Sequence, residues 1–431
     1  MNLRIFIPLL LVVSSQAFPL DTSVSGISDD SLLRTRLAET LFTEPPAAVL
    51  GVKPFVERLD TGERVQIRVE RGRNNDFSII LAREINGAFT GWAQGSFVLT
   101  RNIQDGSVSR IRIFLRSDPY TYIQFRPLNE TKSEMDVIVY DAILSQSLPI
   151  SASFKRLLTM PLNDALNMAG PRFPRRYFEP DPENYTIVRS LISKIRQRLP
   201  EIEFDNDGAI DENGAYVLIN NLQPQGTKHG LNCSGFAKWL TDGLIRPLTG
   251  KRLAITPLKE PYGERGTSFT ESFERTRDPF FGLDWVRNLA AAAGTAFKSA
   301  DFGVLEEIEV RRYPFQAVLM RNGRNSTARY YPGFLQNAGF GMEGIQPLLY
   351  TLAIDEPGFI FLGALNNQGG NPPLRTYFHI VALAPYFDEK KVFHVAVFES
   401  AEETSFNSFR VRYPSHYISL CRIPAAAAFD P

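Results

Sequence analysis

Apolar and polar side chains alternate with a period of two from about residue 50 to residue 144, which restricts this part of the chain to β structure. In a strand, successive side chains point to opposite faces, so strict alternation indicates strands with one buried face. Asp60-Thr61-Gly62, Asn86-Gly87 and Asp105-Gly106 are typical turns between such runs. We therefore predict an all-β domain over 47–150, as an antiparallel sandwich or small barrel. The strand-like runs are 64–69, 77–81, 95–100, 111–116, 120–125 and 136–140.

The first residues resemble an export signal. Arg4 precedes an apolar run from Ile5 to Val13, and Ser15-Gln16-Ala17 offers small residues for cleavage. The run is too short to cross a bilayer as a mature helix. We predict a cleavable signal peptide over 1–17, a secreted or periplasmic location and no integral membrane span.

The rest of the chain divides by composition and periodicity. Residues 18–46 are mixed and polar and predict a linker with a short helix around Leu32–Leu41. Residues 151–214 predict a helical connector, because apolar residues recur at helical spacing between Tyr185 and Leu199. Residues 215–431 form the unit that carries the candidate chemistry.

The charged residues and cysteines limit the possible functions. Lysine plus arginine and aspartate plus glutamate each number 47, so a zero net charge gives no support to nucleic-acid binding. We find no metal-ligand spacing and no phosphate-binding loop, so we expect no metal and no cofactor. The only two cysteines, Cys233 and Cys421, could form a disulfide or be one reactive and one buried thiol.

Cys233 lies at the predicted start of a helix. Asn232 occupies an N-cap position, apolar residues follow at helical spacing, and Pro247 and Gly250 indicate the end. The positive end of a helix dipole stabilises a thiolate, so the sulfur would be nucleophilic near neutral pH. The same backbone N–H groups can bind the oxyanion that forms when sulfur attacks a carbonyl.

A thiolate nucleophile also needs a base, and two of the four histidines begin apolar, strand-like runs. These are His379 and His394, and the turn-like sequence at 388–391 predicts a hairpin that brings them together. We expect His379 to be the base and His394 to orient it. Glu399, further along the same strand, is the alternative orienting residue. It lies an odd number of positions from His394 and so on the opposite strand face, and the residue that shares the face of His379 is favoured.

The run from Asn232 to Phe236, Asn-Cys-Ser-Gly-Phe, resembles the signature of the NlpC-type, papain-like cell-wall peptidases. The resemblance covers the C-terminal half and includes the Pro357-Gly358 strand. It implies a helix packed on an antiparallel sheet, Cys233 as nucleophile, His379 as base and His394 as third residue. It also implies peptidoglycan stem or cross-bridge peptides as substrate.

The chain departs from the family pattern at three places. Asn232 and Phe359 stand where the family has aspartate, and 146 positions separate Cys233 from His379. We interpret about 251–350 as an insertion that forms a wall or lid over the cleft.

The sequence thus predicts an α+β protein: an all-β N-terminal domain followed by a papain-like domain that hydrolyses amides through Cys233, His379 and His394. His229, Asn232 and Ser234 are the expected substrate contacts. The alternatives are an amidase or acyltransferase on another exported substrate, or a periplasmic binding protein with a degenerate papain-like domain. The oligomeric state is not determined by the sequence.

Overall fold

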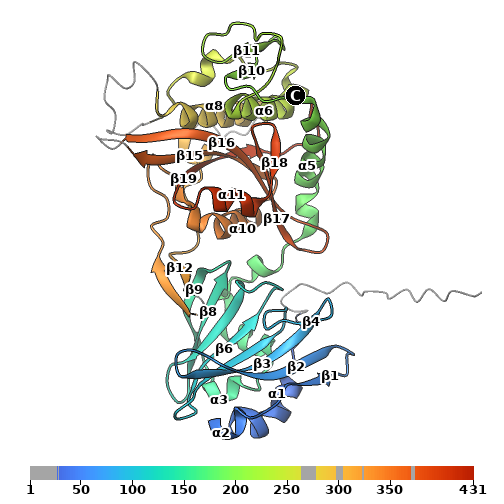
Figure 1. Ribbon diagram of the computed structural model, residues 1–431, viewed down its shortest axis with the longest axis vertical. Helices are drawn as coiled ribbons and strands as arrows, with labels where there is room; N and C mark the ends of the chain where they lie inside the picture. The colour runs from blue at the N-terminus through green and yellow to red at the C-terminus, as the bar shows by residue number, and fades with distance from the viewer. Residues whose placement is uncertain (1–26, 28, 264–277, 298–303, 323–324, 370–373) are drawn as a thin grey trace, which may run out of the picture.

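The computed structural model describes residues 27, 29–263, 278–297, 304–322, 325–369 and 374–431. The predicted signal peptide, residues 1–17, lies outside them. Figure 1 shows two units stacked along the long axis, with the N-terminal strands in one and the C-terminal sheet in the other. The protein is an α+β structure whose N-terminal half is mostly strand, as predicted.

The N-terminal unit is built on one antiparallel sheet. Its order is β1-β2-β3-β5-β6-β7-β8-β9-β12-β13, with β4 paired to β3, so neighbours in space are mostly neighbours in sequence. The strands are β1 Phe55–Arg58, β2 Arg64–Arg71, β3 Asp76–Ile85, β4 Ala88–Phe89, β5 Phe97–Asn102, β6 Val108–Phe114, β7 Tyr122–Pro127, β8 Ser133–Val139, β9 Ala142–Ile150, β12 Ala317–Asn322 and β13 Asn325–Tyr330.

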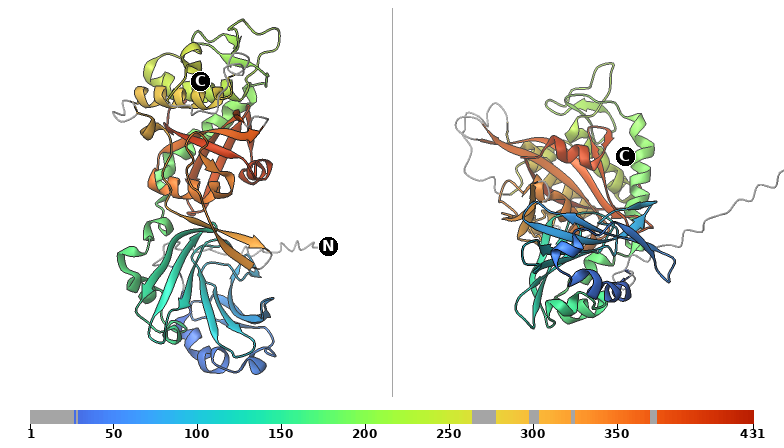
Figure 2. Two further views of the ribbon diagram at one scale, coloured as in Figure 1. Left: turned by 90° about the vertical axis from the view of Figure 1, so that its left-hand side faces the viewer. Right: turned by 60° about the horizontal axis from the view of Figure 1, so that its bottom comes forward.

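All six strand-like runs of the sequence are confirmed as strands, and the turns between them use residues suited to left-handed backbone. Gly62, Gly87 and Gly106 have φ of 85°, 79° and 69°, a conformation that costs glycine little. The expected sandwich is wrong, because the buried face of the one curved sheet packs against helices instead of a second sheet (Figure 2). These helices are α1 Ser31–Leu37, α2 Pro46–Val49, α3 Phe154–Leu157 and α4 Leu162–Ala169.

The residues before the first strand are part of this unit. The short helix predicted around Leu32–Leu41 is confirmed by α1 and the π-helical turn Ala38–Phe42. A linker is wrong for its described residues, because Leu33, Leu37 and Phe42 are buried in the core. Arg34 also donates to the carbonyls of Leu158 and Met160, at 3.0 and 2.5 Å, and so connects α1 to the chain after α3.

The C-terminal unit contains a six-stranded antiparallel sheet in the order β14-β19-β15-β16-β17-β18. The expected hairpin is confirmed, since β16 and β17 pair from Ala382–Phe398 to Phe387–Phe393 around the predicted turn. The strands are β14 Phe340–Gly341, β15 Phe359–Gly369, β16 Leu374–Phe387, β17 Phe393–Glu399, β18 Glu402–Thr404 and β19 Tyr417–Pro424.

Helices cover both faces of this sheet, because its central strands are apolar on both sides. Leu362 and Ala382 belong to the core under α6 and α8, whereas Phe361 and Leu383 belong to the core under α10 and α11. Figure 1 shows the two helix layers, with α5 along one edge. The helices are α5 Thr186–Arg198, α6 Cys233–Thr249, α8 Phe281–Ala296, α10 Ile345–Asp355 and α11 Phe406–Arg412.

The segment 251–350 is not simply a lid, which corrects the sequence interpretation. Its helix α8 buries Leu283, Trp285 and Leu289 in the core beside α6. The hairpin β12–β13 extends the N-terminal sheet by pairing with β9, and β14 pairs with β19. In its described residues the segment therefore completes both sheets and one helix layer.

Of the two predicted stop signals of α6, Gly250 is confirmed, whereas Pro247 lies inside the helix because the C-terminal tail compensates for the proline. Proline has no N–H to donate to the carbonyl of Gly243. That carbonyl instead accepts from the backbone N–H of Asp430 at 2.8 Å. The helix continues to Thr249 and ends at Gly250, whose φ is 73°.

A group of aromatic side chains joins the two units. The guanidinium of Arg116, just after β6, lies 5.8 Å from the ring of Tyr350 and 5.5 Å from the ring of Phe387. It also donates to the carbonyl of Lys391. Tyr140 packs edge-on against Tyr350 at 5.4 Å.

Within the described part of the chain, no helix combines the length and apolar character needed to cross a membrane.

Arg116→Ala should weaken the contact between the units. The loss of two cation–π contacts and a hydrogen bond should lower the free energy of unfolding by about 1–3 kcal/mol. Chemical denaturation measures this change. Arg110→Ala is the matched control, since Arg110 lies on β6, is 37% exposed and faces only a 3.7 Å ion pair with Asp76. Equal losses in both variants would contradict this role of Arg116.

Candidate active site

Cys233 is the first residue of α6, as the sequence predicts. Asn232 caps the helix, and its side-chain oxygen accepts from the N–H of Gly235 at 2.8 Å. The sulfur therefore lies at the positive end of a 17-residue helix, where a thiolate is stabilised. Cys233 as a residue is partly exposed.

The backbone at the start of α6 approaches β10 (Gly208–Ile210) so closely that only glycine fits at the contact. A Cβ on Gly235 would lie 2.0 Å from the carbonyl oxygen of Gly208, and one on Gly208 would lie 2.0 Å from that of Gly230. These distances are well below van der Waals contact. The glycine of the Cys-Ser-Gly run thus fixes the position of the nucleophile.

Ser234 and Asn232 serve the helix start. Ser234 is buried, its carbonyl accepts from the indole N–H of Trp285 at 2.9 Å, and its side chain contributes to the lowered pKa of Cys233. The side chain of Asn232 is occupied by the cap and by the carbonyl of Asn206 at 3.3 Å. Both residues, predicted as substrate contacts, therefore position Cys233.

His379 lies on β16 next to an edge of the sheet that β17 leaves open. The pairing of β16 with β17 ends at Ala382 and Phe398, so in the described chain β17 does not cover the preceding residues of β16. The thiol of Cys233 interacts with the backbone of Ile380 and with the side chain of His379, and both interactions lower its pKa.

Glu399, at the end of β17, completes the group. Its Oε2 lies 2.7 Å from Nε2 of His379. Because Nε2 faces Glu399, Nδ1 is the ring nitrogen left for the sulfur. His379 thus interacts with Cys233 and is hydrogen-bonded to Glu399, whose carboxylate sets the orientation of the ring.

The pKa values of the three groups favour a thiolate beside an imidazolium. Burial raises the pKa of the Cys233 thiol, but hydrogen bonding to His379 and the imidazolium charge outweigh it, and the net pKa is lowered. For His379, burial lowers the pKa, yet the bonds to Cys233 and Glu399 raise it to about 9. Burial likewise raises the pKa of Glu399, and His379 and Arg412 bring it below its ordinary value.

The signs of these shifts define a pH window for stability. The raised pKa of His379 contributes stability that is fully present below 6.5 and is lost as the pH rises through about 9. The lowered pKa of Glu399 contributes stability that is present above 4.5 and is lost as the pH falls through the folded-state pKa. Both contributions are therefore largest in weakly acidic solution.

His394 is not the orienting residue, which corrects the sequence prediction. It pairs with Tyr386, seven positions along β16 from His379, or about 23 Å at the usual strand rise. Its Nε2 lies 3.0 Å from Oδ2 of Asp388, and its ring stacks on Tyr386 at 5.2 Å. In an antiparallel hairpin, two residues lie opposite each other only when they are equally far from the turn. His379 is farther from the turn than His394, so the two imidazoles cannot meet.

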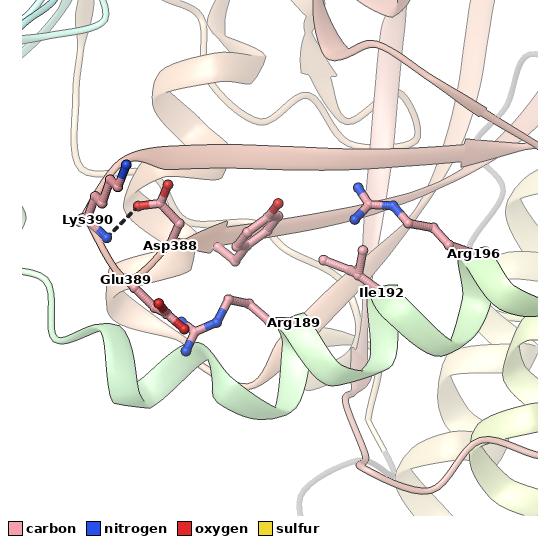
Figure 3. Close-up of a pocket in the computed structure, with 7 residues that line it drawn as sticks. Arg189, Ile192, Arg196, Asp388, Glu389 and Lys390 are labelled. Carbon is pink, nitrogen blue, oxygen red and sulfur yellow. Dashed lines mark hydrogen bonds between the residues drawn. The ribbon is translucent and has the colours of Figure 1, made fainter. Parts of the chain in front are cut away.

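Two cavities lie at the far end of this hairpin. One, of about 380 Å³, lies between α5 and the turn after β16, and Arg189, Arg196 and Lys390 are among its lining residues (Figure 3). The other, of about 290 Å³, includes His394 in its lining. Neither is lined by Cys233, His379 or Glu399, so their volumes say nothing about the candidate active site.

The other singled-out residues lie apart from the triad. His229 is exposed and stacks on Tyr216 at 5.0 Å. Cys421 is a free thiol buried in β19, and burial raises its pKa. Since Cys233 is also free, the structure contains two free thiols and not the disulfide. Among the described residues, no group of three or more histidine, cysteine, aspartate or glutamate side chains could hold a metal.

The comparisons with known proteins reach only the first unit. Residues 23–177 match a family model described as "Domain of unknown function (DUF8515)". No curated protein matches the chain, and no solved structure matches it. The matched residues contain the curved sheet up to β9 and its covering helices, and they end before Cys233.

Gly235→Ala should displace the nucleophile. The new Cβ would overlap the carbonyl of Gly208 at 2.0 Å, so the helix start must move. We expect a loss of about 1–3 kcal/mol in the free energy of unfolding and slower alkylation of Cys233. Gly226→Ala is the control, because a Cβ there meets nothing within 4 Å. Wild-type stability and reactivity in Gly235→Ala would contradict the close approach.

Glu399→Gln should lower the pKa of His379. The amide still offers an oxygen to Nε2 but carries no charge, so the pKa of His379 should fall by roughly one unit, a tenfold change in the protonation equilibrium. The rate of Cys233 alkylation by iodoacetamide, followed against pH by peptide mass spectrometry, reports this change. His394→Gln, at the other end of the hairpin, should leave the profile unchanged. A shift in His394→Gln alone would refute the assignment of Glu399.

Proposed function

We propose that this protein is an exported cysteine hydrolase that cleaves amide bonds through Cys233, His379 and Glu399. The observation that supports the proposal is that His379, hydrogen-bonded to the buried carboxylate of Glu399, also interacts with the Cys233 thiol and lowers its pKa. A reactive thiol at a helix start, a base on a strand edge and an orienting carboxylate are the parts that acyl transfer by cysteine requires.

In the first half-reaction the Cys233 thiolate attacks the amide carbonyl carbon. The carbonyl oxygen becomes an oxyanion, and the C–N bond then breaks. His379 gives its Nδ1 proton to the departing amine, which leaves a thioester on Cys233 and a neutral imidazole. The raised pKa of His379, about 9, keeps the ring protonated for this step at neutral pH.

In the second half-reaction water replaces the amine. Nδ1 of His379 takes a proton from water as the oxygen attacks the thioester. The C–S bond breaks, the product leaves as a carboxylic acid, and the thiolate–imidazolium pair is restored. Glu399 holds Nε2 throughout, so that the same ring nitrogen faces the reaction in both halves.

The oxyanion would be bound at the start of α6. The N–H groups of Gly235 and Phe236 are bonded to the side chain and carbonyl of Asn232. Those of Cys233 and Ser234 come before the first intrahelical bond, where helix N–H groups face outward. Donors held in this way stabilise charge that develops in the transition state.

For the substrate we propose peptides of the bacterial cell wall. This part rests on the resemblance of the Asn-Cys-Ser-Gly-Phe run to the NlpC-type peptidases and on the predicted signal peptide. The papain-like arrangement of the C-terminal unit is proposed on the same basis, together with α6 packed against an antiparallel sheet. Glu399 would stand where that family often has a histidine.

Purified protein should release muropeptide fragments from isolated sacculi, and Cys233→Ala should reduce this release by at least about 1,000-fold, because no other group can form the thioester. Liquid chromatography with mass spectrometry identifies the fragments and the cleaved bond. Cys421→Ala is the control, since Cys421 is a buried thiol outside the triad.

Two results would contradict the proposal in different ways. Unchanged sacculi, together with rapid alkylation of Cys233 at neutral pH, would refute the cell-wall substrate and leave a thiol hydrolase for another exported amide or ester. Alkylation no faster than that of an ordinary thiol would refute the hydrolase itself and favour a binding protein.

A further inference from the structure

We propose that Arg412 is a positioning residue for this active site, which holds Glu399 ionised and oriented so that Glu399 can orient His379. The inference rests on the proposed function and adds a fourth member to its series of groups. Arg412 acts through Glu399 and does not touch the nucleophile in any contact of the described chain.

The geometry places Arg412 at the outer side of Glu399. Arg412 is the last residue of α11, and its Nη1 lies 2.8 Å from Oε1 of Glu399. Its Nη2 donates to Oγ1 of Thr404 on β18 at 3.3 Å, and its guanidinium lies 5.5 Å from the ring of Tyr413. Three separate contacts therefore hold this side chain in place.

The carboxylate needs this neighbour because of its burial. Glu399 is 5% exposed. One of its oxygens, Oε2, is bonded to His379. The other, Oε1, is buried and lies 2.8 Å from Nη1 of Arg412, its ion-pair partner. A buried carboxylate oxygen without compensation is costly, and the positive charge of Arg412 is the compensation that this one has.

The charges around Glu399 come from four elements. Cys233 on α6 and His379 on β16 form the ion pair on its inner side. Arg412 and Tyr413 follow from α11, and the exposed Glu402 pairs with Glu399 across β17 and β18. Arg412 is thus the cation that offsets Glu399 from the solvent side. Its side chain is 46% exposed, so salt should screen its effect.

The sign of the effect follows from Coulomb's law. Removing a positive charge raises the pKa of every neighbouring acid, here Glu399, imidazolium His379 and the Cys233 thiol. Arg412→Gln should therefore move both steps of the Cys233 alkylation profile to higher pH. Glu399→Gln moves the His379 step to lower pH, so the two variants are distinguished by direction as well as by size.

The experiment measures alkylation of Cys233 by iodoacetamide from pH 4 to 11 in the mature full-length chain. For Arg412→Gln in about 20 mM salt we expect an upward shift of about 0.3 pH unit, or twofold in rate near the thiolate step. In about 1 M salt the shift should disappear. Arg412→Lys keeps the charge and should restore the wild-type profile. Arg410→Ala is the control, since Arg410 lies on α11 but donates to Gln346.

If Arg412 had only a structural role, its substitution would change the stability of the protein but not the pH profile of Cys233 alkylation. Thermal unfolding of each variant is therefore measured as well. If Arg412→Gln does not fold, the wild type supplies the test, because salt alone should move its profile upward. If neither the substitution nor salt moves the steps of the alkylation profile from their wild-type pH, the role of Arg412 is overturned and the proposed hydrolase remains. A wild type without a lowered thiolate step would overturn both.

Discussion

The contact between the start of α6 and the open edge of β16 is the constraint on which the rest of the site depends. It requires a helix that approaches β10 closely enough for Gly235 to face the carbonyl of Gly208. It also requires β17 to end before it covers Ile380, whose backbone helps to lower the pKa of Cys233. Cys233 is thus placed by backbone geometry, and side chains then adjust its pKa.

The charges alternate outward from this contact: thiolate, imidazolium, carboxylate, guanidinium. Each group is stabilised in its charged form by the next, which is why burial does not neutralise His379 or Glu399. The exposure of the members rises from Glu399, at 6% of its side chain, to Arg412 at 46%. Salt in the solvent can therefore screen the charge of Arg412 and so change the pKa values of the buried groups.

The local features of the fold and the site could be predicted from the sequence because they depend on neighbours in the chain. The alternation of apolar and polar residues predicted the strands of the first sheet, and Asn232 predicted the N-cap of α6. Identifying the residue that orients His379 also required the register of the hairpin β16–β17. With the turn centred near Lys390, the position opposite His379 lies just beyond Glu399, whereas His394 lies opposite Tyr386. The sequence left His394 and Glu399 as alternatives, and the register of the hairpin distinguishes them.

Long-range packing could not be predicted in the same way. Nothing local distinguishes α8 as a core helix from a helix of a lid, because its burial depends on α6 and three strands that come from elsewhere in the chain. The hairpin β12–β13 joins a sheet whose other strands precede it by more than 160 positions. This exchange, with the aromatic contacts of Arg116, makes the first unit a wall of the second unit's core.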